Sequence, residues 1–91
     1  MEVEAIARLV YDRLETMRAG RVLAVWPDGT VTEEGFGFPG QRRRGDGWES
    51  AVTSFPAGTQ MSYYDMLQRL LARLRVLGLM APEEADEAAD G

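Results

Sequence analysis

The chain has 91 residues, a length typical of one small domain, and 45% of them are apolar, a normal share for a globular chain. It contains no cysteine and no histidine, which excludes disulfides, thiolate metal sites, cysteine nucleophiles and histidine general bases. The net charge is −5, but five acids within residues 82–91 account for it, and the rest of the chain is neutral. The sequence therefore lacks the strong positive charge that most nucleic-acid-binding domains carry.

Residues 2–19 predict an amphipathic helix, because apolar side chains recur along one face at helical spacing. Arg8, Asp12 and Glu15 lie on the opposite face. Gly20 can adopt the left-handed conformation that commonly ends a helix. The predicted apolar face is formed by Val3, Ile6, Ala7, Val10, Leu14 and Met17.

The middle of the chain predicts three strands. Residues 21–26 and 30–38 flank Pro27, Asp28 and Gly29, a strong turn signal, so we expect a β-hairpin there. Residues 39–47 are rich in glycine and arginine and predict a loop. Residues 48–55 predict the third strand by β-propensity. Trp26, at the end of the first strand, is expected to be buried.

Residues 62–80 form the most strongly periodic segment and predict a second amphipathic helix. Ser62 is the expected N-cap, Asp65 lies favourably near the positive end of the helix, and Gly78 is the expected stop. A charge at Leu70 or Leu74 is expected to unfold the domain. The predicted apolar face is formed by Tyr63, Tyr64, Met66, Leu67, Leu70, Leu71, Leu74 and Leu77.

These elements predict an α+β fold in the order α-β-β-β-α, with a three-stranded antiparallel meander and both amphipathic helices on one face. We expect residues 1–80 to form a single domain and residues 81–91 to be an acidic C-terminal tail, either disordered or a short helix. Because so small a body is only marginally stable, a homodimer that hides extra apolar surface is expected.

Catalytic and metal sites are not expected. The chain has no histidine, cysteine or lysine to act as a general base near pH 7 or as a strong nucleophile. Glu33 and Glu34 are adjacent on a predicted strand, so their carboxylates point to opposite faces and cannot form a catalytic pair. No calcium-loop spacing of acids appears. We therefore expect no enzyme, no metal site and no cofactor.

Three consecutive arginines are the first candidate binding feature. Arg42, Arg43 and Arg44 concentrate positive charge between two glycines, and guanidinium groups bind oxyanions in a bidentate manner. They could grip an acidic protein surface or phosphates, or face the acidic tail. The tail itself is either an interaction segment for a basic surface or a solubilising terminus.

Aromatic residues are the second candidate feature. Trp48 has polar neighbours that suggest an exposed loop edge, and tryptophan is a common interface anchor. Phe36 and Phe38 belong to a Gly-Phe-Gly-Phe stretch that resembles the aromatic strand of RNP1 and cold-shock nucleic-acid-binding proteins. The basic residue expected before that stretch is replaced by Glu34.

The sequence therefore predicts a small, non-enzymatic protein-binding module whose partner it does not identify. Such a module would be an inhibitor, an antitoxin- or immunity-like protein, a phage anti-defence factor or an accessory subunit. The alternative is a nucleic-acid-binding module that uses Phe36 and Phe38 with the arginines. With no signal-peptide pattern or membrane-spanning run we expect a cytoplasmic protein. Arginine in place of lysine, together with abundant alanine, glycine and leucine, resembles the composition of a chain from a high-GC genome, and we expect a bacterial or phage protein. The expected partner-binding residues are Arg42, Arg43, Arg44, Trp48, Phe36 and Phe38.

Overall fold

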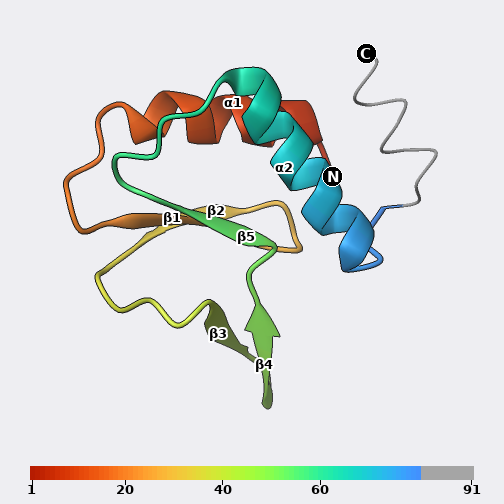
Figure 1. Cartoon of the computed structure of the whole chain (residues 1–91). Helices are drawn as coiled ribbons and strands as arrows, with labels where there is room; N and C mark the ends of the chain where they lie inside the picture. The colour runs from red at the N-terminus through yellow and green to blue at the C-terminus, as the bar shows by residue number, and fades with distance from the viewer. Residues whose placement is uncertain (81–91) are drawn as a thin grey trace.

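A computed structural model describes residues 1–80 (Figure 1). In sequence order, one helix comes first, five short antiparallel strands follow, and a second helix comes last. The acidic tail predicted for residues 81–91 lies outside the described residues. The elements are α1 (Val3–Leu14), β1 (Val22–Val25), β2 (Val31–Glu34), β3 (Gln41–Arg44), β4 (Gly47–Ser50), β5 (Thr53–Pro56) and α2 (Tyr63–Val76).

The main sheet has three strands in the order β2-β1-β5, and both pairings are antiparallel. The predicted hairpin between β1 and β2 is present. The N–H of Trp26 donates to the carbonyl of Thr30, and the N–H of Gly29 donates to the carbonyl of Trp26, both at 2.9 Å. Gly29 has a φ of 89°, which a residue with a side chain rarely adopts, so this tight connection depends on glycine.

The predicted three-stranded meander is wrong, although the α+β class and the two helices are confirmed. The described chain has five strands in two sheets, and β1 rather than β2 is the central strand of the main sheet. The single strand predicted over residues 48–55 is divided at Ala51. The N–H of Ala51 donates to the carbonyl of Gly40, whereas the N–H of Val52 donates to the carbonyl of Val25, so the chain changes sheets between them.

The prediction of a loop over residues 39–47 is also wrong, because this segment contains strand β3. β3 pairs with β4 to form a separate two-stranded hairpin, with Arg42 opposite Glu49 and Arg43 opposite Trp48. Figure 1 shows this hairpin on the side of the main sheet that faces away from the helices. The sheet therefore lies between a helical layer and the hairpin.

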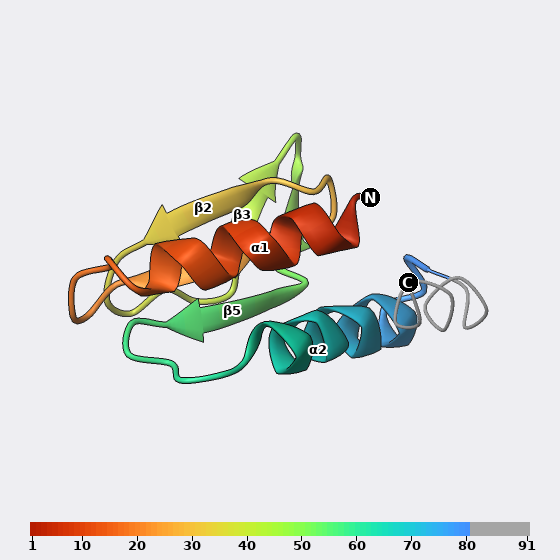
Figure 2. The ribbon, with the colours of Figure 1, turned by 90° about the horizontal axis from the view of Figure 1, so that it is seen from above.

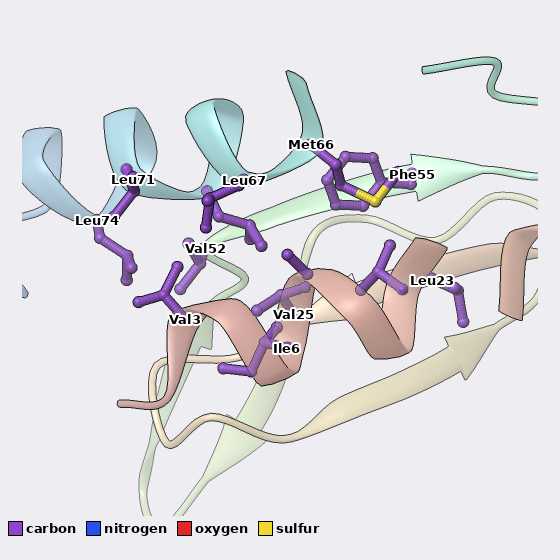
Figure 3. Close-up of a cluster of buried hydrophobic side chains, with 13 residues drawn as sticks. Val3, Ile6, Leu23, Val25, Val52, Phe55, Met66, Leu67, Leu71 and Leu74 are labelled. Atoms are coloured by element: carbon purple, nitrogen blue, oxygen red, sulfur yellow. The ribbon is translucent and has the colours of Figure 1, made fainter. Parts of the chain in front are cut away.

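The hydrophobic core lies between the main sheet and the two helices. Alternation along β1 turns Leu23 and Val25 towards the helices, where they join Phe55 of β5 and the buried face of α2 (Figure 3). Seen from above, α2 runs along the β5 side of the sheet (Figure 2). The helical contributors to this core are Val3, Ile6, Ala7, Val10, Met66, Leu67, Leu70, Leu71 and Leu74.

Local signals define where α2 begins and ends. The predicted N-cap is confirmed, since the hydroxyl of Ser62 accepts from the N–H of Asp65 at 3.0 Å. Gly78 has a φ of 71°, and the N–H of Leu79 folds back to the carbonyl of Leu74 at 2.9 Å, which ends the helix. Both helices are shorter than predicted. In the described part of the chain, neither is long and apolar enough to cross a membrane.

Candidate functional site

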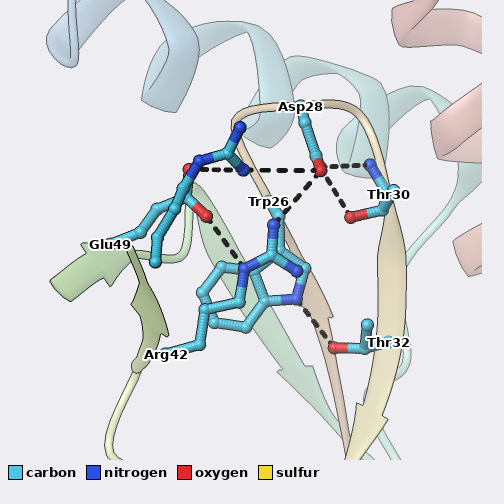
Figure 4. A network of polar contacts seen from close by, with 7 residues as sticks. Trp26, Asp28, Thr30, Thr32, Arg42 and Glu49 are labelled. Carbon is cyan, nitrogen blue, oxygen red and sulfur yellow. Dashed lines mark hydrogen bonds and ion pairs between the residues drawn. The ribbon is translucent and has the colours of Figure 1, made fainter. Parts of the chain in front are cut away.

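Trp26 organises the outer side of the main sheet, which is the side away from the helices. As predicted it is buried, with only 1% of its surface exposed. Its indole N–H donates to the hydroxyl of Thr32 at 2.7 Å, and its ring meets Phe38 edge-to-face at a centroid distance of 5.9 Å. The guanidinium of Arg42 lies over the same ring, 4.1 Å from its centroid (Figure 4). This cation–π contact joins the hairpin to the sheet.

Arg42 is held by two carboxylates from different elements. Its Nε donates to Glu49 on the paired strand at 2.8 Å, and its Nη2 donates to Asp28 in the β1–β2 turn at 3.2 Å. Arg44 lies on the same face of β3 and adds longer ion pairs to Glu49, at 3.5 Å, and to Asp28, at 3.8 Å. These side chains lie on the face of the hairpin that points towards the main sheet, which we call its inner face. Because each acid contacts both arginines, the charges on this face are largely compensated.

The polar network shifts the pKa values of its members. The hydroxyl and then the N–H of Thr30 donate to Asp28 and, with a smaller contribution from Arg42, lower the pKa of that carboxyl to about 2. Desolvation lowers the pKa of Arg42, but Glu49 and then Asp28 outweigh that effect and raise it above the usual value. Both groups are therefore charged at neutral pH, and the ion pairs persist under those conditions.

The opposite face of the hairpin points to solvent, and we call it the hairpin outer face. Trp48 is its main feature and leaves 64% of its surface exposed. The Arg43 guanidinium lies over the Trp48 ring, 5.2 Å from the centroid. Within residues 1–80, Arg43 makes no ion pair, so its charge is available to a partner. The hairpin outer face consists of Gln41, Arg43, Trp48 and Ser50.

The structure does not bring the six predicted binding residues together. Arg42 and Phe38 pack around Trp26, and Arg44 joins the ion-pair network, so these three have structural contacts. Arg43 and Trp48 lie together on the hairpin outer face. Phe36 is elsewhere: it is 95% exposed and borders an apolar cavity of about 340 Å³ at the Val22 and Pro56 end of the main sheet.

Sequence reasoning missed the second hairpin and the acids that hold it. A usable signal was present, because Gly45 and Asp46 form a two-residue connection of a type common in tight hairpins. Recognising that turn would have placed Arg42 opposite Glu49 and separated Arg43 from its neighbours. The contact between Arg42 and Asp28 spans 14 residues and has no local sequence signal.

No group of three or more acidic residues in the described chain is arranged to hold a metal ion. Comparisons with family models, with curated proteins and with solved structures find no match to this chain. The geometry of the surface is therefore what indicates a function for this chain.

Proposed function

We propose that this chain is a non-enzymatic protein-binding module that contacts a partner protein through the hairpin outer face. The observation that carries the proposal is the 64% exposure of Trp48 on a hairpin whose other face is fixed by ion pairs. The proposal covers the class of cytoplasmic inhibitors, antitoxin- or immunity-like proteins, anti-defence factors and accessory subunits.

The chemistry of this face suits protein recognition. Tryptophan and arginine are, with tyrosine, the residue types most enriched among those that dominate interface energies. Arg43 already lies over the Trp48 ring, so both side chains lose less conformational freedom on binding than isolated ones would. The inner ion pairs of Arg42 with Glu49 and Asp28 also hold the hairpin in place before any partner arrives.

Nucleic-acid binding, the alternative, has less support. Affinity for nucleic acid grows with the number of phosphates that basic side chains neutralise. Arg42 and Arg44 are committed to Glu49 and Asp28, which leaves one uncompensated arginine in this strand within residues 1–80. Phe36 borders the cavity lined by Val22 and Pro56, whereas Trp48 lies beside Arg43 on the hairpin outer face.

Affinity capture with matched variants tests the proposal. The wild-type chain, Trp48→Ala and Tyr64→Ala would each be used as bait in a nuclease-treated lysate of the source organism. Tyr64 is a suitable control because it is an aromatic with 60% exposure that lies on α2, away from the hairpin. We expect a stoichiometric partner with the wild type and with Tyr64→Ala, and its loss with Trp48→Ala. Equal capture by all three baits, or recovery of nucleic acid only, would contradict the proposal.

A further inference from the structure

The two edges of the main sheet differ in whether they can accept another strand. At the β5 edge, the outward-facing carbonyls are already occupied. Arg73 Nε donates to the carbonyl of Val52 at 2.9 Å, and Arg69 Nη2 donates to that of Ser54 at 3.4 Å. The next outward position is Pro56, which has no N–H to offer and whose carbonyl accepts from Thr59 at 3.1 Å. The β5 edge is therefore closed by α2 and the following turn.

The β2 edge has no such cover. The hydrogen-bonded pair of Trp26 with Thr30 sets the alternation of the β1–β2 ladder. In this alternation the N–H and C=O groups of Thr32 and Glu34 point towards β1. Those of Val31 and Glu33 point away from it, to the open edge. Within residues 1–80, no group bonds to the outward N–H and C=O of Val31 and Glu33. Two donors and two acceptors are therefore available to an incoming strand.

The charge of this edge selects the incoming strand. Glu33 and Glu34 are adjacent on β2, so they present carboxylates to both faces of the sheet. Arg21 compensates Glu33 at 3.2 Å, whereas Glu34 has no ion pair within the described chain. An incoming strand with acidic side chains, a second copy of β2 among them, would add negative charge beside Glu33 and Glu34, which is unfavourable. We propose that the β2 edge accepts an extended, basic segment of a partner protein.

This inference goes beyond the proposed function, because the β2 edge and the hairpin outer face are different surfaces. A partner could use either or both, and the two sites are tested separately. The probe for the edge is an end-capped hexapeptide, Lys-Lys-Thr-Val-Thr-Val. When it lies antiparallel to β2, its lysines face Glu34 and Glu33. The matched control is the same peptide with both lysines replaced by glutamate.

The titration is followed by amide NMR of the full chain, which detects weak binding residue by residue. We expect the lysine peptide to shift the amides of Val31 and Glu33 and to slow their hydrogen exchange, and the glutamate peptide to have no effect. Glu33→Pro removes an outward N–H while leaving the bonds to β1 intact, and should weaken binding about tenfold or more. Glu33→Gln keeps the N–H and should weaken binding only about two- to fourfold.

Each other outcome overturns the proposal. Binding that is equal in Glu33→Pro and the wild type would show that β2 does not receive the peptide. Shifts confined to the hairpin, or no shift at millimolar peptide, would do the same. Self-association that Glu33→Pro abolishes would assign the edge to a second copy instead.

If Glu33→Pro does not fold, Val31→Pro, which also removes an outward N–H, provides the comparison. Trp48→Ala should bind the peptide as the wild type does, which separates this site from the hairpin outer face.

Discussion

The guanidinium of Arg42 lies over the indole of Trp26, 4.1 Å from the ring centroid, and this contact joins the two sheets of the molecule. The β3–β4 hairpin has no hydrophobic core of its own. Its position depends on Arg42, which reaches across to the buried ring and is bound on either side by Glu49 and Asp28. The geometry of the hairpin outer face therefore depends on residues that a partner would not touch.

Replacing Arg42 should release the hairpin and expose Trp26. In a Trp48→Phe background, where Trp26 is the only tryptophan, Arg42→Ala should shift the fluorescence emission to longer wavelength because water reaches the ring. Hydrogen exchange of the β3 and β4 amides should also accelerate. Arg43→Ala in the same background is the control, since Arg43 contacts Trp48 and not Trp26. Identical emission spectra for the two variants would show that Arg42 does not hold the hairpin against Trp26.

The stability of the fold should depend on pH through Asp28. The pKa of this carboxyl falls from 3.8 to about 2, chiefly because Thr30 donates two hydrogen bonds to the ionised form. The folded state therefore binds the proton less readily than the unfolded chain, so this stabilisation is complete above about pH 4 and is lost as the pH falls towards 2. Urea unfolding at several pH values should show a smaller loss in Asp28→Asn than in the wild type. Parallel curves for the two proteins would contradict the shift.

Thr30→Val separates the contributions to that shift. It removes the hydroxyl donor and keeps the N–H donor of residue 30, so the pKa of Asp28 should lie between the lowered value and the ordinary one. Carboxyl titration by NMR measures this directly. An unchanged pKa in Thr30→Val would mean that the hydroxyl does not contribute.

Leu70 should be among the most sensitive positions of the core. It is buried against the sheet, so Leu70→Ala should lower the free energy of unfolding by about 2–5 kcal/mol, and Leu70→Asp should prevent folding. Val76→Ala, on the exposed side of the same helix, should change the free energy by less than about 0.5 kcal/mol. Urea unfolding measures both. Comparable effects at the two positions would contradict the assignment of the core face of α2.

The arginines that close the β5 edge should suppress self-association. The double variant Arg69→Ala and Arg73→Ala frees the carbonyls of Ser54 and Val52, so light scattering should rise with protein concentration. The double variant Arg13→Ala and Arg18→Ala removes the same charge from the α1 side and serves as the control. If both double variants scatter equally, the effect is due to net charge and not to the open edge.

The helices and the first hairpin could be predicted because their signals are local. Ser62 and Gly78 mark the limits of α2 by local hydrogen bonding and backbone conformation. Helical spacing identifies most of its buried face, but Tyr64 and Leu77, which it also placed there, are exposed. Pro27, Asp28 and Gly29 likewise specify the β1–β2 turn with little help from the rest of the chain. The burial of Trp26 was also correctly anticipated.

The second sheet could not be predicted from propensity, because β3 consists of glutamine and arginines. Its strand conformation comes from pairing with β4 and from the carboxylates that Arg42 meets across the fold. The division of the predicted third strand at Ala51 also depends on distant partners, since the carbonyl of Gly40 accepts from the N–H of Ala51 and the carbonyl of Val25 accepts from the N–H of Val52. The predicted binding site was wrong for the same reason. Its three arginines, expected together on one loop, lie on two opposite faces of strand β3.

The affinity of the captured partner for the wild type, Trp48→Ala and Tyr64→Ala tests the central claim most directly. Measured by titration calorimetry, Trp48→Ala should weaken binding by about 30-fold or more, as expected when an interface anchor worth about 2 kcal/mol is truncated. Tyr64→Ala should bind within about threefold of the wild type, the range of a residue outside the interface. Equal affinities for all three proteins would show that the hairpin outer face is not where the partner binds.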